Sequence, residues 1–186
     1  MMNYSNAERK QLLDLIRYSI EYGLEKNALP RVDPADYPPK FSEKRATFVT
    51  LRKDGRLRGC MGTLEAERGL MEDVIQNAQA AAFRDPRFPR LTRSELERID
   101  IHLSVLTPYE ILSVDDEADL LRKLRPEIDG IILEEGAKRA TFLPSVWESL
   151  PGPAEFIRKL KAKAGLPETH WSDRIRIYRY TAESIH

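Results

Sequence analysis

The single cysteine of this chain, Cys60, lies in the stretch Leu57-Arg58-Gly59-Cys60-Met61-Gly62-Thr63, between two glycines and close to an arginine. A cysteine thiolate is a nucleophile and a redox centre, and a neighbouring guanidinium favours the thiolate form. Glycines in a strand remove side-chain cover, so that a ligand or another backbone can approach. The stretch therefore indicates a candidate site at Cys60 and Arg58, but the residues alone do not name a reaction.

Each candidate catalytic residue also has a structural interpretation. Cys60 can be a small buried apolar residue, and Arg58 can either bind a carboxylate or phosphate ligand or form an internal ion pair. His102 can act as a base for Cys60 only if the fold brings the two side chains together. Otherwise it is a histidine bonded to a backbone group or a carboxylate. Cys60, His102 and His170 are scattered without the close spacing of metal ligands, so we predict no metal and no cofactor.

A second group of residues is expected to bind substrate around the same stretch: Gly59, Gly62, Thr63, Arg84 and Asp85. The glycines could cradle a phosphate, although no phosphate-loop motif is present, and close packing against a helix is the alternative. Arg84 and Asp85 precede Pro86 just after a predicted helix. They either form a structural ion pair or line a cleft, and Asp85 before Pro86 is typical of a residue that caps and shapes a turn.

Composition excludes several classes of protein. The 186 residues are enough for one domain or two joined lobes, and the 30 basic and 30 acidic residues cancel, which argues against a nucleic-acid or membrane surface. A single cysteine cannot form an internal disulfide, and no apolar segment approaches the ~20 residues of a membrane span. We therefore expect a cytoplasmic protein.

The candidate site depends on a predicted hairpin. Two strand-like runs, Ala46 to Lys53 and Arg56 to Met61, are joined by Asp54-Gly55, a dipeptide favoured in type I′ turns. With these two residues as the loop, Lys53 pairs with Arg56 and Val49 pairs with Cys60. Alternation along the strands then predicts that Arg58, Cys60, Leu51 and Val49 share one face.

Helices and further strands surround this hairpin. Helical periodicity and capping-box spacing predict helices over 6–24 and 67–83 and a short one after Thr92. Alternation predicts a strand over 99–106, with His102 on its polar face, and a second hairpin over 128–134 and 138–143. Short helices near 117–124 and 153–164 and a strand over 174–180 complete the order. The fold class is α+β, with a mixed, largely antiparallel sheet, flanking helices and two packed subdomains.

Several ordered motifs resemble the AMMECR1 domain family, and the compact length resembles the protein A members of the AmmeMemoRadiSam system. Besides the Leu57–Thr63 stretch, the motifs are Ala82-Phe83-Arg84-Asp85-Pro86-Arg87-Phe88, Ser104-Val105-Leu106-Thr107-Pro108, Gly130-Ile131, Ala140-Thr141-Phe142-Leu143-Pro144, Lys163-Ala164-Gly165-Leu166-Pro167 and Trp171. The resemblance implies an α+β fold of two subdomains with a cleft near the first motif, and an association with Memo-like and radical SAM proteins. It supplies no activity.

Two hypotheses about function follow, and the sequence does not decide whether the protein is an enzyme. In the first, it is an enzyme or enzyme subunit whose Cys60 and Arg58 act on a small anionic or redox-active substrate. In the second, it is a non-catalytic accessory or binding module for a Memo-like or radical SAM partner. The chemical environment of the Cys60 sulfur discriminates between the two hypotheses.

Overall fold

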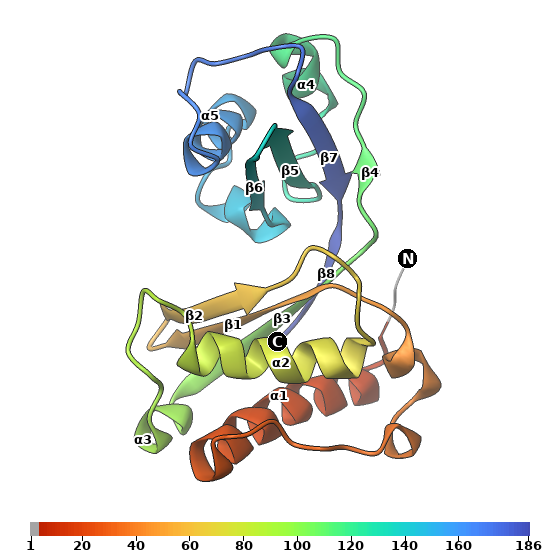
Figure 1. Cartoon of the computed structure of the whole chain (residues 1–186), viewed down its shortest axis with the longest axis vertical. Coiled ribbons are helices and arrows are strands. Elements are labelled where there is room, and N and C mark those ends of the chain that lie inside the picture. The colour runs from red at the N-terminus through yellow and green to blue at the C-terminus, as the bar shows by residue number, and fades with distance from the viewer. Residues whose placement is uncertain (1–3) are drawn as a thin grey trace. The chain divides into compact units, whose positions relative to one another are not determined.

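The computed structural model describes residues 4–186, which form two compact units (Figure 1). One comprises the described chain up to Leu106 together with Glu183–His186, and the other comprises Thr107–Ala182. Each unit contains helices and a four-stranded sheet, which confirms the α+β class. In the described part of the chain, no helix is both long and apolar enough to cross a membrane.

Two helices cover one face of the sheet in the first unit (Figure 1). Helix α1 (Asn6–Lys26) begins at the predicted capping box, in which Ser5 and Glu8 each accept a hydrogen bond from the other's backbone N–H. It buries an apolar stripe that includes Leu12, Ile16 and Ile20, and α2 (Leu70–Phe83) lies beside it. These helices and the sheet enclose the core of the first unit.

The sheet of the first unit has the strand order β2-β1-β3-β8, with bounds Thr47–Lys53 (β1), Arg56–Gly62 (β2), Ile99–Leu106 (β3) and Ala182–Ile185 (β8). The predicted hairpin is confirmed: Asp54 and Gly55 have φ angles of 52° and 74°, as a type I′ turn requires. Short 3₁₀ turns at Pro34–Asp36 and Pro39–Ser42 link α1 to β1. Between α2 and β3, helix α3 (Arg93–Leu96) carries the predicted Thr92/Glu95 capping box.

The register of the hairpin differs from the prediction beyond its first pair. Lys53 does pair with Arg56, but a β-bulge makes Arg58 an extra residue, because Arg52 pairs with Leu57 and Leu51 pairs with Gly59. Cys60 therefore lies opposite Thr50, and the predicted pairing of Cys60 with Val49 is wrong. A bulge inserts one residue into one strand only, so every later residue of β2 changes its partner and its face.

The second unit has the strand order β4-β7-β5-β6, with bounds Glu110–Ile111, Arg176–Tyr180, Gly130–Glu135 and Lys138–Phe142, respectively. The second predicted hairpin, β5 with β6, is confirmed. Helices α4 (Glu117–Lys123) and α5 (Pro153–Lys163) and a 3₁₀ turn (Pro144–Glu148) pack around it. The rings of Trp147 and Phe156 stack in its core, with centroids 3.8 Å apart.

Candidate functional site

Cys60, Thr50 and His102 form one row across three strands of the first sheet. The register pairs Thr50 with Cys60 on one side and with His102 on the other. Val49 and Leu51, the neighbours of Thr50 in β1, are fully buried in the core beneath α1 and α2, so the row lies on the opposite face. All three row residues are half-buried. This face is where the structure brings Cys60 and His102 onto one surface.

The sulfur of Cys60 has a defined polar contact. The hydroxyl of Thr50 donates a hydrogen bond to Cys60 Sγ over 3.2 Å. His102 lies one strand further on, and neighbouring strands are ~4.8 Å apart, so Thr50 stands between the thiol and the imidazole. The arrangement does not form a direct cysteine–histidine pair. It brings a thiol, a hydroxyl and an imidazole along one line.

The backbone of Cys60 is held from outside the sheet, because β2 is an edge strand. Asp85 Oδ2 accepts the Cys60 N–H at 2.9 Å, and Arg87 Nη2 donates to the Cys60 carbonyl at 3.4 Å. Arg87 also pairs with both oxygens of Asp85. These two residues take the place of a neighbouring strand along this edge.

Asp85 is buried and ionised in this arrangement. The side-chain hydrogen bond from Arg87 is the main reason that the pKa of Asp85 falls to about 2, and the N–H groups of Cys60 and Arg87 lower it further against the opposing effect of burial. We predicted Asp85 as a substrate-binding residue. In the structure its oxygens bind this strand edge and Arg87.

Arg58 forms the ion pair that was one of its two predicted roles. Its Nε and Nη2 atoms donate to the two carboxylate oxygens of Glu95 over 2.9 and 3.0 Å, and Nη2 also donates to the Pro89 carbonyl. The hydrogen bond from Arg58 is the main reason that the pKa of Glu95 lies well below its usual value. Lys53 donates to the same carboxylate. Arg58 thus binds α3 rather than the Cys60 row.

The bulge explains why Arg58 and Cys60 have different partners. Arg58 is the extra residue of the bulged strand, so it joins Lys53 on Glu95 instead of alternating onto the face of Cys60. The predicted shared face of Arg58, Cys60, Leu51 and Val49 is therefore wrong. The Nε and Nη2 atoms of Arg58 are already bonded to Glu95 and Pro89. Its Nη1 atom has no hydrogen-bond partner within residues 4–186, but it is buried, so no donor of Arg58 is available to a ligand at the surface.

The two glycines beside Cys60 are required for packing. A Cβ atom on Gly59 would lie 2.2 Å from the Ala81 carbonyl oxygen of α2, and one on Gly62 would lie 2.3 Å from the Phe48 ring. Gly59 therefore lets β2 approach the helix backbone, which is the structural alternative that the sequence left open.

The remaining predicted substrate-binding residues lie in two different places. The Thr63 hydroxyl donates to Asp73, a fully buried carboxylate that also accepts hydrogen bonds from Thr47, Arg68 and Asn77. This network joins the start of β1 and the end of β2 to α2. Arg84 is exposed at the C-terminal cap of α2.

His186 extends the row to the fourth strand. It follows β8 directly, and its ring stacks on that of His102 with centroids 5.4 Å apart. Thr50, Arg87 and His186 were not among the predicted site residues. Thr50 could have been found only from the correct register, and Arg87 and His186 carry no local signal of their own. Within residues 4–186 no three His, Cys, Asp or Glu side chains are grouped as metal ligands.

Comparison with known proteins identifies the family. A family profile described as AMMECR1 matches residues 13–185. The chain belongs to the AMMECR1 family. A relative from Methanothermobacter thermautotrophicus is 38% identical over 98% of this chain and 95% of its own length, and one from Thermotoga maritima is 38% identical over 82% and 84%.

A solved structure shares this fold. The crystal structure of the uncharacterized protein PH0010 from Pyrococcus horikoshii superimposes with a TM-score of 0.90 at 32% identity, covering 97% of this chain and 91% of that one. The similarity extends over both units. This AMMECR1 chain therefore shares the fold of that protein along nearly its whole length.

Proposed function

We propose that this AMMECR1 protein is an enzyme or enzyme subunit that acts on a small anionic or redox-active substrate at the Cys60 face of its first sheet. The row of Cys60, Thr50 and His102 carries this proposal, because it combines a thiol with a hydroxyl donor and an imidazole on one half-buried surface. A thiol can attack an electrophile or exchange with a disulfide, and an imidazole can bind an anion when protonated.

The roles within the proposal follow from the contacts. Cys60 is the reactive group, and Thr50 orients it by donating to its sulfur. His102 contacts the far end of the substrate instead of taking the thiol proton, since Thr50 lies between them. Arg58, Gly59, Asp85 and Arg87 are positioning residues, because their contacts are with α2, α3 and the backbone of Cys60.

The alternative is a non-catalytic accessory module for a Memo-like or radical SAM partner of the AmmeMemoRadiSam system. One observation favours it. The amide, carbonyl and sulfur of Cys60 each have a hydrogen-bond partner, as expected for a cysteine used in packing. An unreactive thiol would support this alternative.

The proposal is tested by the rate at which iodoacetamide alkylates Cys60 in the folded protein, measured by mass spectrometry across pH. Because the chain has a single cysteine, the signal comes from one site. We expect faster alkylation than for a free cysteine in a short peptide, slower alkylation in Thr50→Val, and recovery in Thr50→Ser. Ser104→Ala, a half-buried position on the same face of β3, is the matched control.

A cellular experiment tests the catalytic role itself. A strain carrying Cys60→Ser is expected to accumulate a small anionic or redox-active metabolite relative to the parental strain, while the protein level stays the same. An inert thiol together with an unchanged metabolite profile would overturn the proposed enzyme and leave the accessory module.

A further inference from the structure

Strand β3 extends beyond its outer neighbour. β3 has eight residues and pairs with β1 from Ile99 to Val105, whereas β8 on its other side has four. The stacking of His186 on His102 marks where β8 ends. Within residues 4–186 no other strand pairs with the outer edge of β3, so the segment 99–101 has a strand neighbour on one side only.

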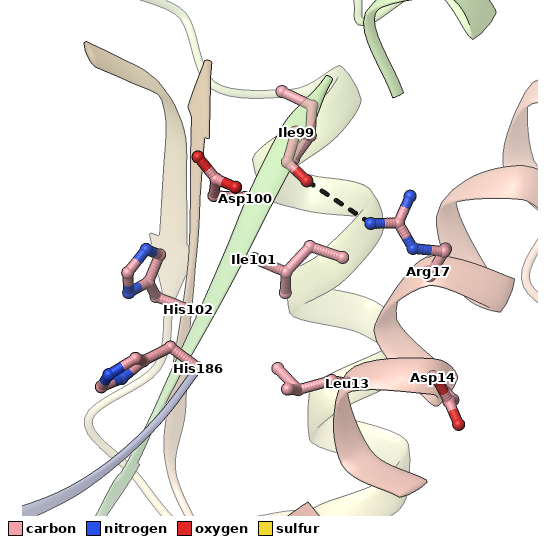
Figure 2. Close-up of a pocket in the computed structure, with 8 residues that line it drawn as sticks. All are labelled: Leu13, Asp14, Arg17, Ile99, Asp100, Ile101, His102 and His186. Atoms are coloured by element: carbon pink, nitrogen blue, oxygen red, sulfur yellow. Dashed lines mark hydrogen bonds between the residues drawn. The ribbon is translucent and has the colours of Figure 1, made fainter. Parts of the chain in front are cut away.

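A groove follows this open edge. It has a volume of about 540 Å³ and lies between β3 and α1, and its lining includes Leu13, Arg17 and Ile101 (Figure 2). In Figure 2 the carbonyl of Ile99 points across the groove, and Arg17 Nη2 donates to it over 3.4 Å. The same guanidinium donates to the carbonyl of Leu96 through Nη1 at 3.1 Å. A side chain thus occupies the position where a paired strand would donate.

We infer that this groove binds an extended peptide segment of a partner protein, which adds to the edge of β3 in line with β8. An unpaired strand edge offers the repeating N–H and C=O groups that an extended chain recognises, and this mode of recognition is general. Because α1 forms the opposite wall of the groove, an added chain would lie between β3 and α1. The 3.4 Å bond from Arg17 is at the limit of a hydrogen bond, so an incoming amide can replace it.

The groove also selects the side chains of the peptide. In a strand, alternate side chains point to opposite faces. On one face they would meet Leu13 and Ile101, which are partly buried apolar residues at the edge of the core. On the other they would pass Asp100, which is exposed and lies on the same face of β3 as His102 and His186. Asp14 lies on the α1 wall, on the side of Leu13. Lys10 pairs with Asp14, but both side chains are mostly exposed, so this pair contributes little and can exchange. The preferred peptide alternates apolar and basic residues.

The test uses a fluorescein-labelled hexapeptide of alternating lysine and valine, with binding followed by fluorescence anisotropy. Two further peptides are controls: one with glutamate in place of lysine, and one with a central proline, which lacks a backbone donor. We expect the lysine–valine peptide to bind and the two controls to bind at least tenfold more weakly. Hydrogen exchange of the complex should protect the amides of Ile99 and Ile101, whose backbone groups face the groove, and not those of the β2 edge.

Variants locate the site. Asp100→Lys should weaken binding about fivefold, whereas Asp173→Lys, an exposed aspartate of the second unit, should leave it unchanged. Arg17→Ala should leave binding equal or stronger, because it removes the competing donor. Circular dichroism verifies that each variant is folded.

Three outcomes would overturn the inference. The first is equal binding of the proline peptide, and the second is protection that maps away from β3. The third is a concentration-dependent dimer that protects the same amides without peptide, which would assign the edge to a second copy.

Discussion

The ion pair between Arg58 and Glu95 allows a direct test of whether Arg58 has a structural role. The sequence allowed Arg58 to be either a ligand-binding or a structural residue, and the structure gives it two hydrogen bonds to Glu95. We consider the substitutions Arg58→Met and Glu95→Gln, singly and together. Methionine keeps much of the apolar stem of arginine and removes the charge.

The expected loss of stability follows from the burial of both side chains. The Arg58 and Glu95 side chains are 9% and 18% exposed, so they are screened little by solvent. Breaking a buried pair by removing one partner costs roughly 3–5 kcal/mol. Glu95 retains Lys53 and its capping bonds to Thr92, so we take the lower end and expect Arg58→Met to lose about 3 kcal/mol. Glu95→Gln also weakens the α3 cap, and the coupling energy between the two sites should be about 2 kcal/mol.

Urea denaturation followed by far-UV circular dichroism measures these free energies of unfolding. Alkylation of Cys60 under native conditions provides a second readout, and it should be unchanged in Arg58→Met, since Arg58 contacts α3 and not the sulfur. A coupling energy below about 0.5 kcal/mol would refute the structural assignment. A large change in the alkylation rate of Cys60 in Arg58→Met, without a loss of stability, would also refute it and would indicate that Arg58 acts on the Cys60 thiol.

Two further predictions concern the backbone around Cys60. Gly59→Ala should lose at least 3 kcal/mol in the same urea assay, toward or beyond the upper end of the roughly 1–3 kcal/mol typical of overpacking, because the new Cβ meets the Ala81 carbonyl. Gly152→Ala, where a Cβ meets no atom within 4 Å, should lose no more than about 1 kcal/mol, and equal losses in both would contradict the packing argument. Asp85 has a folded-state pKa of about 2, below its ordinary 3.8, so its stabilising effect is complete above pH ~5 and is lost as the pH falls toward 2. The stability gap between the parental protein and Asp85→Asn should be about 1–2 kcal/mol at neutral pH, after allowing for the 55% exposure of Arg87, and should shrink to about 0.4 kcal/mol or less at pH ~2. A gap that does not change with pH would refute this account.

Local sequence signals were sufficient to predict most of the helices and strands. The Ser5/Glu8 and Thr92/Glu95 capping boxes and the Asp54-Gly55 turn all lie where the sequence predicts them. Each depends on residues within four positions of one another, so short-range chemistry determines it. β4 and β8 were not predicted, because two and four residues carry too little periodicity.

The candidate site could be predicted only in part. The sequence named Cys60 and His102 as candidates and correctly predicted the strands that carry them, but it gave the wrong partner for Cys60. Because Arg58 is an extra residue in β2, Cys60 lies opposite Thr50 and Arg58 pairs with Glu95. No local pattern signals this bulge.

The sequence by itself therefore determined the family motifs, the hairpin and the α+β class, because helix caps, turns and alternation are local properties. Only the tertiary structure decided which residues face Cys60 and which support it. The approach of β2 to the Ala81 carbonyl, the pairing of Arg58 with Glu95 and the Asp85–Arg87 clamp all join residues more than twenty positions apart. Such contacts depend on how β2 packs against α2 and α3. The strand register decides which way each side chain of β2 points, and buried polar groups must find hydrogen-bond partners in that register.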